Sequence, residues 1–182
     1  MRALRYTKRI MTFVRQHPLV WTFIRILLFQ KSPDVIPASW FLLGILLLIN
    51  LGVGIASFAV QYDVLSSVLR TLADMLISIC FVYLVLMAAN KSARSLQTIS
   101  AMLGVSIILN ILSLPLLMML AEKQLSAGFA GLFLYVIFCW HIAVMGHIFR
   151  HALSVRLTVG MMVSFVYILV AMAIFYSLFP VQ

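Results

Sequence analysis

Three histidines are the side chains of this sequence best suited to metal or proton chemistry. His147 and His151 are four residues apart, a spacing that puts two metal ligands on one face of a helix. His141 falls on a different face, and no Asp or Glu nearby completes a ligand set. We therefore predict no metal, no cofactor and no catalytic residue. We interpret His147 and His151, beside Arg150, as headgroup contacts at a helix C-terminus, where cations are favoured. Metal binding and pH sensing are the alternatives.

A single carboxylate, Asp74, lies inside an apolar run. An acid within a membrane is a candidate proton relay or ion site. Arg70 lies one helical turn earlier, and a same-face pair would neutralise the carboxylate, which is the interpretation we prefer. Asn50, Asn110 and His141 also fall inside apolar runs, and with Asp74 they form a candidate intramembrane polar network.

The composition is that of a membrane protein. Of 182 residues, 65% are hydrophobic and only 9% are charged, whereas a soluble domain has about a quarter charged residues. We predict an all-α, polytopic integral membrane protein with no separate soluble domain. The net charge is +9, and the basic residues stand at the ends of apolar runs. Their expected partners are anionic lipid headgroups and not nucleic acid.

Residues 1–37 are predicted to form a basic amphipathic segment, cytosolic or interfacial, that ends in a proline-containing turn. Its apolar stretch is too short to span a bilayer. We expect an interfacial helix with Trp21 and Phe23 as anchors and with Arg25 and Lys31 directed towards headgroups. The alternative is a cytosolic helix packed under the bundle. The segment resembles a signal peptide, but Arg25 interrupts its apolar run and no A-x-A site follows, so we expect it to be retained.

Residues 38–182 are predicted to form a transmembrane domain of five helices. The expected spans are 39–60, 71–89, 96–120, 127–149 and 157–179. Every Lys and Arg except Arg70 and Lys123 falls in the N-terminal region or in the second–third and fourth–fifth turns. By the positive-inside rule, these regions are cytoplasmic and the C-terminus lies on the opposite side.

The sequences of two turns, with the spans beside them, are similar to those of a known family. A small basic turn leads into a Ser- and Gly-dotted third span that ends in proline, NKSARSLQTISAMLGVSIILNILSLP. Trp140 then precedes a second basic turn, RHALSVR. With five expected spans, this arrangement resembles the Yip1 superfamily, in particular its bacterial inner-membrane members. The resemblance covers roughly residues 20–180. It implies a five-helix bundle in a bacterial cytoplasmic membrane and supplies no catalytic residues.

Two functions are compatible with this sequence. The first is a non-enzymatic bundle that organises or binds lipids or other membrane proteins, including a second copy of itself. Its candidate contacts at the cytoplasmic face are Arg25, Lys31, His147, Arg150, His151 and Arg156. The alternative is a transporter or channel component, in which Asn50, Asp74, Asn110 and His141 would converge on one water-accessible path.

Overall fold

The computed structural model describes residues 18–122 and 127–180. Within these ranges, five helices are long and apolar enough to cross a membrane. They are α3 (Trp40–Phe58), α4 (Val64–Ala88), α5 (Ser95–Ala121), α6 (Ala127–Leu153) and α7 (Leu157–Leu178). A shorter helix, α2 (Pro18–Leu27), precedes them. The prediction of an all-α membrane protein with five spans and an N-terminal helix is confirmed, and the chain is a multi-pass membrane protein.

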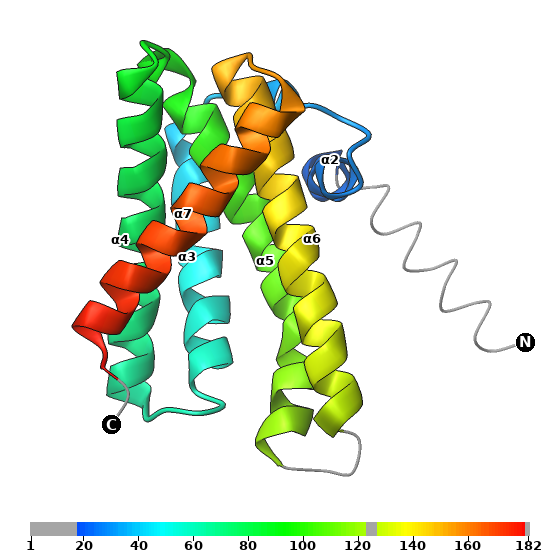
Figure 1. Cartoon of the computed structure of the whole chain (residues 1–182), viewed down its shortest axis with the longest axis vertical. Helices are drawn as coiled ribbons and strands as arrows, with labels where there is room; N and C mark the ends of the chain where they lie inside the picture. Colours follow the sequence, from blue (N-terminus) through cyan, green and yellow to red (C-terminus); the bar gives the residue numbers. More distant parts are fainter. Residues whose placement is uncertain (1–17, 123–126, 181–182) are drawn as a thin grey trace, which may run out of the picture.

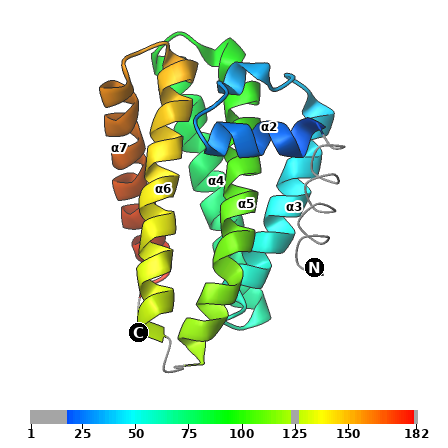
Figure 2. The same ribbon diagram turned by 90° about the vertical axis from the view of Figure 1, so that its right-hand side faces the viewer.

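The five long helices pack as a closed ring. Helix α3 packs against α4 and α5, α6 packs against α5 and α7, and α7 returns to α4. The α4–α5 and α6–α7 connections lie at one end of this ring, which we call the basic end (Figure 1). Helix α2 lies across α5 near the same end, at a steep angle to the spans (Figure 2). The ring therefore gathers the two basic turns and α2 at one end.

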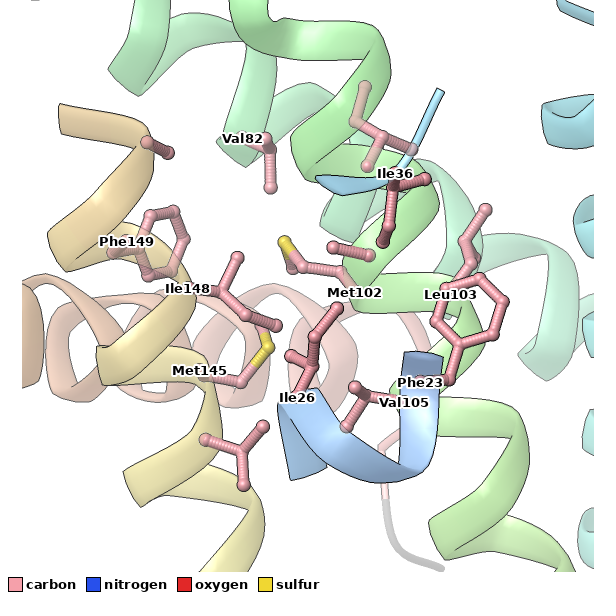
Figure 3. Close-up of a cluster of buried hydrophobic side chains, with 14 of the residues drawn as sticks. Phe23, Ile26, Ile36, Val82, Met102, Leu103, Val105, Met145, Ile148 and Phe149 are labelled. Atoms are coloured by element: carbon pink, nitrogen blue, oxygen red, sulfur yellow. The ribbon is translucent and has the colours of Figure 1, made fainter. Parts of the chain in front are cut away.

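Part of the apolar core lies where α2 meets the spans (Figure 3). Ile26 of α2 is fully buried, and Met102 of α5 and Ile148 of α6 belong to the same cluster. The α2 sequence has a strongly one-sided apolar face, which favours docking of that face on the bundle. Burial of apolar side chains thus holds α2 against the ring.

Two spans extend several residues beyond their predicted limits. Helix α4 begins at Val64 and not at Thr71, because the Asp63 side chain caps it by accepting from the Ser66 amide at 3.1 Å. The Ser66 hydroxyl also donates to this carboxylate at 2.6 Å, and together these bonds hold the pKa of Asp63 below its usual value. Helix α6 continues past Phe149 to Leu153, so the predicted turn at 150–156 is mostly helix.

Three helices stop at the basic end in the same way. Phe29, Asn90 and Ser154 have φ values of 58°, 56° and 53°, which is the left-handed region. After α4, the Lys91 amide donates to the Leu86 carbonyl at 2.7 Å. After α6, the Val155 amide donates to the Arg150 carbonyl at 3.0 Å. These are Schellman-type ends, in which glycine is the usual left-handed residue. Here all three positions hold other residues, so backbone strain is present at each.

Asn90 offers a direct test of this strain. Glycine has no Cβ penalty in the left-handed region, so Asn90→Gly should raise the free energy of unfolding by up to about 1 kcal/mol. Alanine at the same position should lower it by about 1 kcal/mol or more. Thermal unfolding of both variants in detergent measures the difference. Equal stabilities of the glycine and alanine variants would contradict the assigned backbone conformation.

Candidate functional site

Helix α2 packs against the spans at Gly104 of α5, where the missing side chain leaves a notch. Phe23 of α2 is only 5% exposed. A Cβ built on Gly104 of α5 would overlap the Phe23 ring. Only glycine at this position leaves room for the ring at the α5 surface. Phe23 was predicted to be an interfacial anchor, and this is wrong because the ring packs into the bundle. Trp21 on the other side of α2 is exposed, as an anchor would be.

The end of α2 is fixed by side chains of α6. The indole nitrogen of Trp140 donates to the Leu27 carbonyl at 3.1 Å. The Nε2 atom of His147 lies 3.2 Å from the Lys31 carbonyl, which can only accept, so His147 donates this bond. The Phe29 ring packs edge-on against both, with centroid distances of 5.4 Å to Trp140 and 5.3 Å to His147. This aromatic cluster offsets the strained backbone of Phe29.

His147 does not have the predicted role of a headgroup contact. Its side chain is 7% exposed, and its Nε2 atom is used by the Lys31 carbonyl. The helix spacing could not reveal this, because the ring is covered by α2, which lies far away in sequence. The His151 ring packs edge-on against His147, at 4.7 Å between ring centroids, and is half-buried. No group of three His, Cys, Asp or Glu side chains in the described ranges is placed to hold a metal ion.

Two of the basic residues at this end bind protein carbonyls. Lys91 donates to the Leu153 carbonyl. Arg94 donates to the His151 carbonyl at 3.1 Å and to the Ser154 hydroxyl at 2.8 Å. Cations at a helix C-terminus satisfy its free carbonyls and interact favourably with the helix dipole. Lys91 and Arg94 therefore join the α4–α5 turn to the end of α6.

The remaining cations at the basic end face outwards to differing degrees. Arg150 and Arg156 are exposed, whereas Lys31 and Arg25 are half-buried. The Arg25 guanidinium lies 5.3 Å from the Trp21 ring centroid. Its Nε atom is buried and has no hydrogen-bond partner among residues 18–122 and 127–180. Arg150 and Arg156 flank the α6–α7 connection. Of the six predicted contact residues, these two are the most accessible to an anionic group.

A second cluster of polar groups lies midway along the spans. A cavity of about 30 Å³ is lined by residues of all five spans. Its polar lining consists of Asn50 of α3, Ser78 of α4, Ser106 of α5 and Tyr167 of α7. Ser78 and Tyr167 are hydrogen-bonded at 2.7 Å. The ring of helices thus encloses a polar layer about halfway between its ends.

The predicted intramembrane network is only partly brought together. Asn50 lines the cavity, and His141 of α6 reaches its edge through Ser106, at 3.4 Å from Nε2 to Oγ. Asn110 is half-buried on α5, one turn beyond Ser106, and does not line the cavity. Asp74 has an exposed side chain on α4 and also does not line it. Sequence reasoning missed Ser78 and Tyr167, because a Ser or Tyr in a span carries no signal of its cross-helix partner.

Asp74 and Arg70 do not form the predicted pair. Arg70 packs against aromatic rings instead, with its guanidinium 3.9 Å from the Tyr62 centroid and 4.6 Å from that of Phe179. An arginine over ring faces gains a cation–π attraction, and here it ties α4 to the end of α7. The rings of Tyr62 and Phe179 therefore take the place of the carboxylate as partners of Arg70.

Comparison of the chain with protein-family models, curated protein sequences and solved structures finds no match. The Yip1 resemblance stays a prediction.

The contact between Phe23 of α2 and Gly104 of α5 predicts a strongly non-additive double-mutant cycle. Gly104→Ala should lower the free energy of unfolding by about 1–3 kcal/mol, because the added Cβ meets the Phe23 ring. In a Phe23→Ala background the clash is gone. Gly104→Ala should then be neutral or stabilising by up to about 1 kcal/mol, since alanine favours helix over glycine.

Gly52→Ala is the matched control, because nothing lies within 4 Å of a Cβ built there. It should not destabilise in either background. Chemical or thermal unfolding of the five variants measures the cycle. Additive effects of Gly104→Ala and Phe23→Ala would show that the two residues do not touch.

Proposed function

We propose that this protein is a non-enzymatic membrane bundle that binds anionic phospholipid at its basic end and so organises lipid around its spans. The observation that carries the proposal is that some cations at that end bind protein carbonyls whereas others are exposed. Lys91 and Arg94 bind carbonyls of the α6 terminus, whereas Arg150 and Arg156 are exposed beside it. Two exposed arginines at the end of membrane helices are suited to a phosphate group, which a guanidinium can bind through two parallel hydrogen bonds.

An apolar hollow between α6 and α7, further along the spans, supports the same function. It measures about 530 Å³ and is lined by Ile142, Met161, Met162, Phe165 and Val166. Met161 and Met162 follow Arg156 on α7, and a rise of 1.5 Å per residue places them roughly 8–9 Å further along the helix. This spacing suits a lipid with its phosphate at Arg156 and an acyl chain in the hollow. The occupant we propose is therefore an anionic glycerophospholipid.

The location follows from the same charge distribution. We place the basic end at the cytoplasmic face of a bacterial inner membrane, with the C-terminus on the opposite side, because positive residues are retained in cytoplasmic loops. Anionic lipid in that leaflet attracts such residues. A membrane-protein partner or a second copy could bind the exposed faces of the spans, and this stays a prediction.

The transporter alternative finds less support. A transport path needs polar groups that converge on a space large enough for a solute. The central cavity measures about 30 Å³, and neither Asp74 nor Asn110 lines it. Such a space holds water molecules and not a larger solute. The proposed bundle function therefore accounts better for the arrangement of the polar groups.

Arg150→Gln/Arg156→Gln tests the proposal. Each basic residue near an anionic surface contributes about 1 kcal/mol, so the double variant should bind phosphatidylglycerol about 2 kcal/mol more weakly, roughly thirty-fold. Binding to phosphatidylcholine should not change. Lipid titration into detergent-solubilised protein, followed by native mass spectrometry, measures both.

The matched control is Arg150→Lys/Arg156→Lys, which keeps the charge and should retain most of the preference for anionic lipid. The glutamine variant should unfold at the same temperature as the natural chain, since neither side chain makes a hydrogen bond in the described structure. An unchanged preference for phosphatidylglycerol in the glutamine variant would reject the proposed site.

A further inference from the structure

The central cavity contains a hydrogen-bond acceptor that the protein leaves without a donor. Asn50 lies in the middle of α3, is 6% exposed and lines the cavity. Its Oδ1 atom is buried and has no hydrogen-bond partner among the described protein atoms. A buried amide oxygen without a partner is strongly unfavourable, and most such groups in proteins are bonded to protein or to an ordered water molecule.

The opposite side of the cavity presents a second acceptor. The Ser78 hydroxyl donates to the Asp74 main-chain carbonyl at 2.8 Å, because a carbonyl can only accept. Ser78 has one hydrogen, so Tyr167 must be the donor in the 2.7 Å bond between their hydroxyls. Tyr167 also has a single hydrogen. Because Tyr167 lines the cavity, its oxygen is left as an acceptor for a group bound there, as is Asn50 Oδ1.

A water molecule can donate a hydrogen bond to both of these acceptors. It carries two hydrogens, one for each acceptor, and a lone pair that can accept from the Ser106 hydroxyl at the cavity wall. A cavity needs at least about 10–15 Å³ to hold a water molecule, with two to four polar partners around it. This cavity measures about 30 Å³ and its wall includes Asn50, Ser106 and Tyr167. Both the space and the partners are therefore sufficient.

We propose that the cavity is a binding site for an ordered water molecule that donates to Asn50 Oδ1 and to the Tyr167 oxygen. This water joins α3 to α7, and Ser106 extends the bonds to α5. Ser78 and His141 continue them to α4 and α6. One water molecule thereby links polar groups of all five spans, and it does so independently of the lipid site at the basic end.

Hydroxyl-radical footprinting of the intact protein in nanodiscs tests this site. Met75, Met102 and Met145 line the cavity and are buried, and methionine is readily oxidised to the sulfoxide. X-ray radiolysis of a bound water makes radicals beside them. We expect these three methionines to be oxidised at a measurable rate, although their side chains are buried from bulk solvent. When the solvent is switched to H₂¹⁸O shortly before irradiation, ¹⁸O should appear in these methionines more slowly than in exposed ones. The reason is that the bound water exchanges slowly with the solvent.

Asn50→Leu removes the acceptor and should lower oxidation of the three methionines several-fold. The matched control is Asn110→Leu, the same change at a residue outside the cavity wall, which should leave their oxidation unchanged. No oxidation of Met102 and Met145 in the natural chain, or oxidation rates unaffected by Asn50→Leu, would overturn the proposal.

A high-resolution map of the natural chain gives a second measurement that does not depend on any variant folding. The expected result is a density peak about 2.7–3.0 Å from both Asn50 Oδ1 and the Tyr167 oxygen, as for ordinary hydrogen bonds. No peak there, or a peak at the shorter distances of a metal ion, would contradict the water site.

Discussion

Side-chain donors that satisfy the carbonyl ends of helices hold the basic end of this bundle together. Every helix leaves its last carbonyls without an internal partner, and a carbonyl that a neighbouring element covers must find a donor within the protein. Lys91 and Arg94 supply donors to the end of α6. Trp140 and His147 supply them to the end of α2 and to the segment that follows it. Because the donors come from other elements, each bond also fixes one helix relative to another.

The polar layer at mid-membrane uses neutral groups for the same purpose. Most hydroxyls in the spans bond back to their own helix, as Ser113 does to the Leu109 carbonyl and Thr71 to the Ser67 carbonyl. Such bonds satisfy the hydroxyl but do not link one helix to another. Tyr167 differs, because its hydroxyl bonds to another span. A layer of neutral donors and acceptors ties helices together without the cost of burying a charge.

The spans themselves could be read from the sequence, because long apolar runs separated by short polar turns leave few alternatives. Boundaries were less predictable. The N-terminal cap by Asp63 extends α4 through residues that read as a polar connector. Roles that depend on contacts distant in sequence could not be predicted. His147 has the spacing and position of a headgroup contact, and only the docking of α2 buries it. Gly104 likewise looks like any small residue in a span until Phe23 is placed above it.

The number of basic residues in a turn predicts the side of the membrane on which the turn lies better than it predicts the role of each residue. Charge alone treats Arg94 and Arg150 as equivalent members of basic turns. Their surroundings separate them, since the Arg94 guanidinium binds the His151 carbonyl, whereas the Arg150 side chain is exposed. If the basic end binds anionic lipid as proposed, replacement of Arg94 should weaken that binding indirectly, by freeing the end of α6 that carries Arg150. A loss of lipid binding therefore identifies a headgroup contact only when the variant keeps these carbonyl bonds intact.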